Sequence, residues 1–180
     1  MTNWIHNINS PDDLKKVPLE KLPELAQEYR QALIEYIAKT GGHLGASLGA
    51  LELNLALHYV LNSPKDKICW DVGHQAYVHK MVTGRRDRMT TIRQPHGLSG
   101  FPSPFENPHD HFIVGHAGTA ISQALGLAVA RDFKRGDENV VAVAGDGALT
   151  AGLSYEALNN AGNMKKRMLI VLNDNEMSIS

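Results

Sequence analysis

The segment Asn139-Val-Val-Ala-Val-Ala-Gly-Asp-Gly-Ala-Leu-Thr150 joins a continuous apolar run to a turn in which an aspartate stands between two glycines. An apolar run without polar alternation is typical of a parallel strand that is buried on both faces. Helical periodicity resumes over residues 152–162, so the turn lies where a strand ends and a helix begins. Ligands of open α/β sheets bind outside the carboxyl ends of the strands, and this turn is therefore a candidate binding site.

The same pattern extends along the rest of the chain. Residues 67–71 are expected to form a short buried strand, and residues 168–172 a fully apolar one. Strands that alternate with helical crossovers predict an α/β fold, a parallel sheet flanked by helices on both of its faces. Residues 94–115 are rich in Pro and Gly and lack periodicity, which indicates a long functional loop. The expected helices lie over residues 25–37, 48–61, 75–83 and 119–133.

Composition excludes several classes of protein. With 180 residues and 43% hydrophobic content, the chain can form a core, which excludes disordered and collagen-like classes. Eighteen basic against nineteen acidic residues give a net charge of −1, so no basic field favours nucleic acid or an anionic membrane as partner. A cytoplasmic location is favoured by three observations: Cys69 is the only cysteine, no apolar run is long enough for a membrane span, and there is no signal-peptide pattern.

Two strand ends carry oxygen donors suited to a divalent cation. Asp146 lies between two glycines, and its negative carboxylate would repel a bare diphosphate. The two groups are compatible when a cation such as Mg²⁺ lies between them. Asn175 follows the next predicted strand, 29 positions later, and one crossover brings both strand ends to the same edge. Ordinary turn chemistry is the alternative interpretation of each motif alone. A Rossmann fingerprint is excluded because Thr150 stands where the third glycine would be, and a P-loop fails for want of Gly-Lys-Ser/Thr.

The wider sequence resembles one family of thiamine-diphosphate enzymes. Gly145-Asp-Gly147 followed by Asn175 is similar to the thiamine-diphosphate motif, and the surrounding stretches resemble the 1-deoxy-D-xylulose-5-phosphate synthase family over nearly the whole chain. The stretches that carry the resemblance are Thr40-Gly-Gly-His-Leu-Gly45, Trp70-Asp-Val-Gly-His-Gln-Ala-Tyr77, Thr83-Gly-Arg-Arg86, Gly97-Leu-Ser-Gly-Phe-Pro102, Glu156-Ala-Leu-Asn159 and Asn173-Asp-Asn-Glu-Met-Ser-Ile-Ser180.

The resemblance implies a reaction and a set of site residues. The family joins pyruvate, after loss of CO₂, to D-glyceraldehyde 3-phosphate, giving 1-deoxy-D-xylulose 5-phosphate, a precursor of isoprenoids, thiamine and pyridoxal. Its cofactors are thiamine diphosphate and Mg²⁺. By resemblance, His43 and His74 are the expected catalytic residues, because imidazole titrates near neutral pH. The expected metal ligands are Asp146, Asn175 and the backbone carbonyl of Met177; the expected cofactor contacts are His74, Gly115, His116, Ala117, Gly147, Ala148 and Asn175.

The remaining histidines and arginines receive less specific interpretations. Nine histidines are present. His58 is expected to be a structural helix histidine, while His79 and His96 remain open between structure and function. Arg85 and Arg86 could bind a substrate phosphate or lie solvated at a helix end. The histidines expected to be solvated are His6, His109 and His111.

The chain departs from the family pattern at several positions. The family often has Pro where this chain has Val78, and Gly where it has His96. Ser residues of the family are replaced at Ala117, Gly118 and Ala120, so the turn after Gly115 lacks the serine hydroxyls that could bond the cofactor. It is closer to the Gly-His-x-Gly turns of transketolases.

Three hypotheses follow for the function. The first is that residues 1–180 form the amino-terminal Mg²⁺ and diphosphate-binding domain of such a synthase, with 94–115 as an active-site loop. The second is the corresponding part of a transketolase-like enzyme, and the third is a non-catalytic fragment. Under the first hypothesis the rest of the polypeptide supplies pyrimidine-binding and carboxyl-terminal domains, the enzyme is a homodimer, and this chain alone is expected to be inactive.

Overall fold

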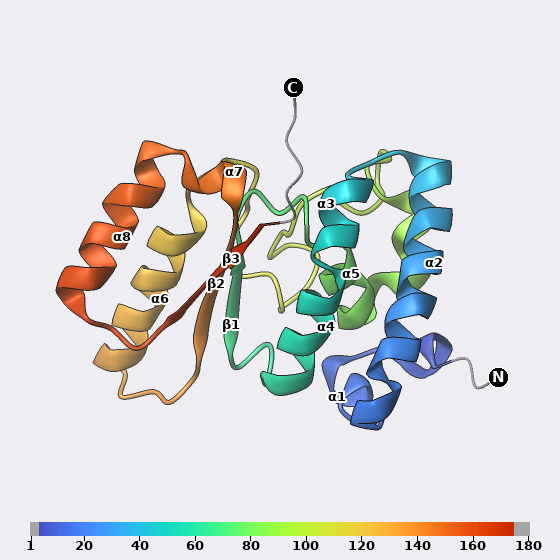
Figure 1. The fold of residues 1–180 in the computed structure, drawn as a ribbon, viewed down its shortest axis with the longest axis horizontal. Helices are drawn as coiled ribbons and strands as arrows, with labels where there is room; N and C mark the ends of the chain where they lie inside the picture. Colours follow the sequence, from blue (N-terminus) through green and yellow to red (C-terminus); the bar gives the residue numbers. More distant parts are fainter. Residues whose placement is uncertain (1–3, 175–180) are drawn as a thin grey trace. The chain divides into compact units, whose positions relative to one another are not determined.

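The structure, a computed structural model, describes residues 4–174, which form two compact units (Figure 1). The first unit comprises residues 4–62 and 74–100, and the second comprises residues 63–73 and 101–174. No helix in residues 4–174 combines the length and hydropathy that crossing a membrane requires.

The first unit is built from helices alone within the described residues. The longest, α2, spans Leu22–Thr40, and α4 spans Leu51–Val60 (Figure 1). The predicted helix over residues 48–61 is divided at Ala50, whose φ of −108° and ψ of 9° separate α4 from the preceding helix. The other helices of this unit are η1 (Ile5–Asn7), α1 (Pro11–Leu14), η2 (Leu19–Lys21), α3 (Leu44–Gly49), α5 (Tyr77–Lys80), η3 (Met81–Arg85) and η4 (Arg86–Thr91).

The four-residue periodicity in α2 corresponds to its buried face. Leu25, Tyr29, Leu33 and Ile37 all lie in the core of the first unit, as the sequence predicts. The helix ends where expected, at Gly41, which has a φ of 70° and donates its N–H to the carbonyl of Ile37. This core also includes side chains from α4, α5 and η4.

The second unit contains a three-stranded parallel sheet in the order β1-β2-β3. Its strands are β1 (Lys67–Trp70), β2 (Val140–Gly145) and β3 (Leu169–Asn173), and its helices are α6 (Ala120–Phe133), α7 (Asp146–Leu149) and α8 (Gly152–Met164). α6 packs against β1 and β2, and α8 packs beside α6 (Figure 1). The predicted α/β architecture with a parallel sheet is confirmed.

Consecutive side chains of β1 and β2 are buried whichever face of the sheet they point to. Cys69, Val140 and Ala142 join the core that α6 covers, and the alternate residues Ile68 and Val141 are also buried. Because the residues that point to either face are buried, the sequences of these two strands are continuously apolar.

β3 differs from the prediction of a fully buried strand. Leu169 and Leu172 are 52% and 55% exposed, and Ile170 and Val171 are half-buried. Within residues 4–174, β3 is the edge of the sheet and pairs with β2 alone, which leaves its side chains partly uncovered. Apolar composition therefore predicted the strand but not its exposure in this chain.

The loop predicted over residues 94–115 contains neither helix nor strand, in agreement with its Pro and Gly content. Its first part, to Gly100, belongs to the first unit, and the rest belongs to the second. The assignment of residues 1–180 to a single binding domain stays a prediction.

Candidate functional site

The turn between β2 and α7 places Asp146 at the carboxyl end of the sheet. β2 ends at Gly145, and Asp146 follows it as the first residue of α7 with an exposed side chain. Gly147 is also exposed, and a Cβ built on it would meet no atom within 4 Å. The carboxylate of Asp146 and the backbone of Gly147 are both accessible to a ligand beyond the strand end.

The register of the sheet aligns the two strand ends that carry the predicted metal ligands. Gly145 is the register partner of Asn173, so β2 and β3 finish at the same level. Asp146 and Asp174 are the next residues of the two chain segments. The other two predicted ligands, Asn175 and Met177, lie outside the described residues. Within residues 4–174, no group of three or more His, Cys, Asp or Glu residues could hold a metal ion.

Hydroxyl groups fix the turn that follows Asp146. Thr150 donates its hydroxyl to the carbonyl of Gly147 at 2.7 Å, and Ser154 donates to the carbonyl of Ala148 at 2.9 Å. Ala148, one of the predicted cofactor contacts, is itself buried. Because diphosphate oxygens only accept hydrogen bonds, any diphosphate contact with the backbone of Gly147 and Ala148 would fall on their N–H groups.

The second predicted binding turn, Gly115–Thr119, lies directly against the first. Gly118 has a φ of 84°, and a Cβ built on it would meet Ala151 and Ser154 at 3.0 Å. A serine, which the family often has at this position, would therefore be strained and crowded here. Three predicted cofactor contacts in this turn, Gly115, His116 and Ala117, are all exposed.

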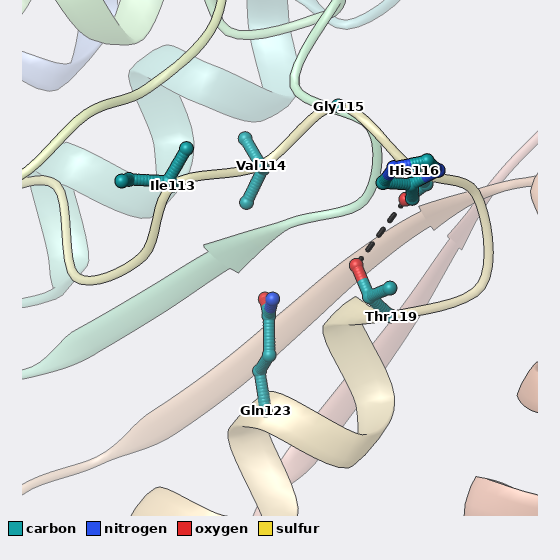
Figure 2. Close-up of a pocket in the computed structure, with 6 residues that line it drawn as sticks. All are labelled: Ile113, Val114, Gly115, His116, Thr119 and Gln123. Atoms are coloured by element: carbon teal, nitrogen blue, oxygen red, sulfur yellow. Dashed lines mark hydrogen bonds between the residues drawn. The ribbon is translucent and has the colours of Figure 1, made fainter.

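A cavity of about 330 Å³ lies beside this turn (Figure 2). Figure 2 shows His116 above it and Gln123 of α6 extending from below toward Val114. The side-chain oxygen of Gln123 is buried and accepts no hydrogen bond in the structure. Thr119 donates its hydroxyl to the carbonyl of His116 at 3.2 Å, which closes the turn at the rim of the cavity.

The two predicted catalytic histidines come together in the first unit. The ring centroids of His43 and His74 are 5.7 Å apart in an edge-to-face arrangement. The hydroxyl of Tyr77 lies 3.5 Å from Nδ1 of His43. The hydroxyl of Ser47 donates to the carbonyl of His74 at 3.0 Å, which fixes the backbone of the second histidine.

The environment of His43 favours its neutral form. Burial lowers the pKa of His43 below its ordinary value of 6.5, and the nearby His74 and Arg93 lower it further. A neutral imidazole can accept a proton or a hydrogen bond at neutral pH. His43 therefore has the protonation state of a general base.

The glycine before His43 is required by a close approach. Gly42 has a φ of 139°, and a Cβ built on it would come within 2.7 Å of the Tyr77 hydroxyl. Glycine thus allows the ring of Tyr77 to pack against the backbone that carries His43.

Several of the other histidines have structural partners. His58 and His79 are fully buried, stack at 5.0 Å, and share a hydrogen bond of 2.8 Å between Nε2 and Nδ1. His58 is therefore the structural histidine that was expected, and His79, left open by the sequence, has a structural role beside it.

His6 is exposed as predicted. His109 is half-buried and shares a 2.8 Å hydrogen bond with Ser63, so the prediction that it is solvated was wrong. His111 is half-buried as well, and its ring Nε2 is buried, which corrects the same prediction.

The arginine pair is buried. Arg85 and Arg86 are only 3% and 7% exposed, so of the two interpretations left open by the sequence, the solvated helix end was wrong. Arg86 donates to the carbonyls of Ile5 and Ile8 and, at 3.2 Å, to the side chain of Asn9. The chain kinks at Gly84, with a φ of 84°, just before the pair, and this kink was not visible as a change in periodicity.

Two departures from the family pattern have local explanations. His96 is exposed and has a φ of 61°, a left-handed conformation in which glycine is unstrained. Val78 is the second residue of α5, where the N–H needs no partner within the helix, so Val and Pro are both compatible with the backbone.

Two residues of the site were missed by the sequence reasoning. Tyr77 contacts His43, and Asp71 accepts hydrogen bonds from the backbone of Gly118 and Ala120. A signal for Asp71 was present: it follows the apolar run of β1 just as Asp146 follows that of β2.

Comparison with known proteins gives the family. The sequence model of the 1-deoxy-D-xylulose-5-phosphate synthase family matches residues 5–180. The chain belongs to this family. The 1-deoxy-D-xylulose-5-phosphate synthase of Syntrophomonas wolfei is 57% identical over 180 residues, all of this chain, and that of Brevibacillus brevis is 59% identical over 173 residues, or 96% of it. The chain spans 28% of the length of each of these relatives.

Two solved transketolase structures are similar to this member of the synthase family. The transketolase of Campylobacter jejuni has a TM-score of 0.80 at 24% identity, covering 90% of this chain and 29% of its own. The transketolase of Leishmania mexicana has a TM-score of 0.76 at 22% identity, covering 90% of this chain and 28% of its own. At such identities the likeness is one of fold.

Proposed function

We propose that the full-length protein containing this chain is a thiamine-diphosphate-dependent transferase. It joins pyruvate and D-glyceraldehyde 3-phosphate to give 1-deoxy-D-xylulose 5-phosphate and CO₂, the first step of the non-mevalonate isoprenoid pathway. The observation that carries the proposal is the pair of aligned strand ends, Gly145 opposite Asn173, followed by the acid and amide donors of the family motif. Family membership over residues 5–180 supports the same reaction.

In this proposal Mg²⁺ and the diphosphate of the cofactor bind at the carboxyl ends of β2 and β3. The exposed carboxylate of Asp146 is a hard oxygen donor of the kind that Mg²⁺ prefers, and the open space at Gly147 leaves room for phosphate oxygens. The metal ligands are Asp146, Asn175 and the carbonyl of Met177, and the cofactor contacts are His74, Gly115, His116, Ala117, Gly147, Ala148 and Asn175.

The chemistry divides between the cofactor and the protein. When bound, thiamine diphosphate supplies a nucleophilic carbon that attacks a ketone. His43 and His74 are the catalytic residues of the proposal, because hydroxyl protons must be accepted and returned near neutral pH. The lowered pKa keeps the His43 imidazole neutral, so it can accept such a proton. The Tyr77 hydroxyl, 3.5 Å from Nδ1 of His43, orients the ring.

The assembly around the chain is part of the proposal. The remaining polypeptide supplies the pyrimidine-binding and carboxyl-terminal domains, and residues 94–115 form an active-site loop. The enzyme is a cytoplasmic homodimer. The coverage of 28% of each relative supports a multidomain protein.

A transketolase-like activity is the second candidate. The fold similarity to transketolases and the sequence Gly115-His-Ala-Gly118 favour it. Identities of 57–59% to the synthases, against 22–24% to the transketolases, favour the synthase. Product analysis separates the two, because the synthase releases CO₂ from pyruvate and a transketolase cleaves a ketose phosphate.

The test is an Asp146→Ala variant of the full-length protein. Calorimetric titration with thiamine diphosphate in the presence of Mg²⁺ is expected to show binding to the wild type and loss of the metal-dependent part in the variant, because a Mg²⁺ ligand is missing. Asp137→Asn is the matched control, since Asp137 is an exposed acid just before β2, at the opposite end of the strand. Equal cofactor affinity in wild type and Asp146→Ala would refute the proposed site.

A further inference from the structure

Asp71 is a fully buried carboxylate at the carboxyl end of β1. Its Oδ1 accepts the N–H of Gly118 at 2.8 Å, and its Oδ2 accepts the N–H of Ala120 at 3.1 Å. Its own N–H donates to the carbonyl of Val143 at 2.8 Å, which continues the β1–β2 ladder by one residue. The carboxylate is thus held by the sheet, while both of its oxygens hold the turn before α6.

This arrangement caps α6 with a residue from another element. Thr119 precedes the helix but caps none of its N–H groups with its side chain. Asp71, 47 residues earlier than Gly118, supplies the acceptor instead. A carboxylate is favourable there because the first N–H groups of a helix lack partners and the helix dipole attracts negative charge. Hydrogen bonds to an ionised acceptor are also stronger than those between neutral groups.

The same two bonds restrict a turn that has few other means of keeping its shape. Gly115 and Gly118 have φ values of 150° and 84°, in a region that glycine samples at little cost. Ala117 and Ala120 carry no hydroxyl that could bond the backbone. The hydroxyl of Thr119 bonds only within the turn, to the carbonyl of His116. Asp71 therefore ties this turn to the rigid end of the sheet.

The two strand-end turns differ in how open their N–H groups are to a ligand. At the turn before α6, the N–H groups of Gly118 and Ala120 already donate to the carboxylate of Asp71. At the β2–α7 turn, by contrast, Gly147 is exposed and has open space around its Cα. The amides bonded to Asp71 are therefore less available to a ligand than the backbone of Gly147.

We infer that Asp71 is a positioning residue for cofactor binding, which holds the Gly115–Thr119 turn in the conformation that receives thiamine diphosphate. The inference rests on the proposed function, since it takes this turn to be a cofactor contact. Asp71 itself does not contact the cofactor; it acts through the backbone of Gly118 and Ala120.

The test compares Asp71→Asn with Asp66→Asn in the full-length protein. Asp66 is the matched control, because it is also buried, flanks β1 at the opposite end, and accepts the N–H of Asn139 at 2.6 Å. Asp71→Asn keeps the shape but turns an amide NH₂ toward one of the two N–H groups. The dissociation constant of thiamine diphosphate at saturating Mg²⁺, measured by calorimetry, is expected to rise about 10-fold or more in Asp71→Asn, the loss typical of a charged hydrogen bond.

A second measurement follows the turn without the cofactor. Hydrogen exchange of the Gly118 and Ala120 amides is expected to accelerate in Asp71→Asn and to stay unchanged in Asp66→Asn. The turnover number at saturating cofactor should change less than the cofactor affinity, since Asp71 touches no reacting atom. If the Asn variant fails to fold, Asp71→Ser, which replaces the carboxylate with a smaller polar side chain, serves the same comparison.

The possible outcomes distinguish a failure of the positioning role from a failure of the proposed function. Equal cofactor affinity in Asp71→Asn and Asp66→Asn, with a wild type that binds the cofactor, overturns the positioning role. A wild type that fails to bind thiamine diphosphate overturns the proposed function. In that event the exchange rates still report whether Asp71 holds the turn, and unchanged rates overturn that part as well.

Discussion

At the scale of single residues, His43 is the side chain whose chemistry depends most on its neighbours. Burial is the largest cause of its lowered pKa, followed by the proximity of His74 and then of Arg93. An NMR titration of the full-length protein, with the signal assigned through His43→Gln, is expected to give His43 a pKa below 6.5. In His74→Gln the pKa of His43 should rise, because one neighbouring positive charge is lost on acidification.

The lowered pKa of His43 also determines how the contribution of this residue to stability changes with pH. Because the folded protein holds His43 neutral to lower pH than the unfolded chain does, the unfolded state binds the proton first as the pH falls. The contribution of His43 to stability is therefore fully present above pH 6.5, the unfolded value, and is lost as the pH falls toward the folded pKa. His43→Gln should flatten this part of the stability profile. A His43 that titrates at or above 6.5 would contradict the assigned environment.

At the scale of elements, Arg86 ties the amino-terminal segment to the helices of the first unit. Its guanidinium donates to the carbonyls of Ile5 and Ile8 and is almost fully buried. Arg86→Met should destabilise the full-length protein by roughly 2–4 kcal/mol, because buried carbonyls lose charged donors. Thermal unfolding measures the loss, and limited proteolysis should show faster cleavage within the first ten residues. Arg88→Met, at an exposed position of η4, is the control and should change little.

The same variant decides between the structural and the substrate-binding roles of this arginine. A phosphate-binding Arg86 would leave stability intact on substitution and raise the KM for D-glyceraldehyde 3-phosphate. Burial against backbone carbonyls instead predicts lower stability with an unchanged KM in the fraction that remains folded.

The sequence predicted those helices and strands whose pattern is contained within one segment of the chain. The buried face of α2 follows from residues spaced four apart, such as Leu25 and Tyr29, and β2 follows from its unbroken apolar run. The parallel order followed from the crossovers between strands. At the candidate site, Asp146 was found because the strand and the turn are adjacent in sequence.

What the sequence left undecided depends on contacts between distant segments. The pairing of His58 with His79 and the bonds from Asp71 to the α6 turn join residues 21 and 47 positions apart. The burial of Arg86 depends on carbonyls nearly eighty residues away. No periodicity within one segment indicates such partners, which is why the roles of His79 and Arg86 both stayed open.

At the scale of the whole molecule, the exposed leucines of β3 are expected to pack against another part of the full-length protein. The chain spans 28% of the length of its relatives, and β3 is the edge of the described sheet. Leu169 and Leu172 are about half exposed, although apolar side chains on a parallel strand are ordinarily buried. If the remaining domains cover this strand in the full-length protein, these leucines are core residues there.

Leu169→Ser and Leu172→Ser in the full-length protein test this expectation. Each should lower the free energy of unfolding by about 1.5–3 kcal/mol, the value of fully burying such a side chain, seen as a lower midpoint of thermal unfolding. Phe133→Ser is the control, because Phe133 at the end of α6 is 86% exposed and lies away from the edge of the sheet that β3 forms. If all three substitutions are equally harmless, β3 faces solvent in the full-length protein as well. A loss confined to the two leucines would mean that another part of the full-length protein covers β3, as the uninterrupted hydrophobic pattern of this strand predicts.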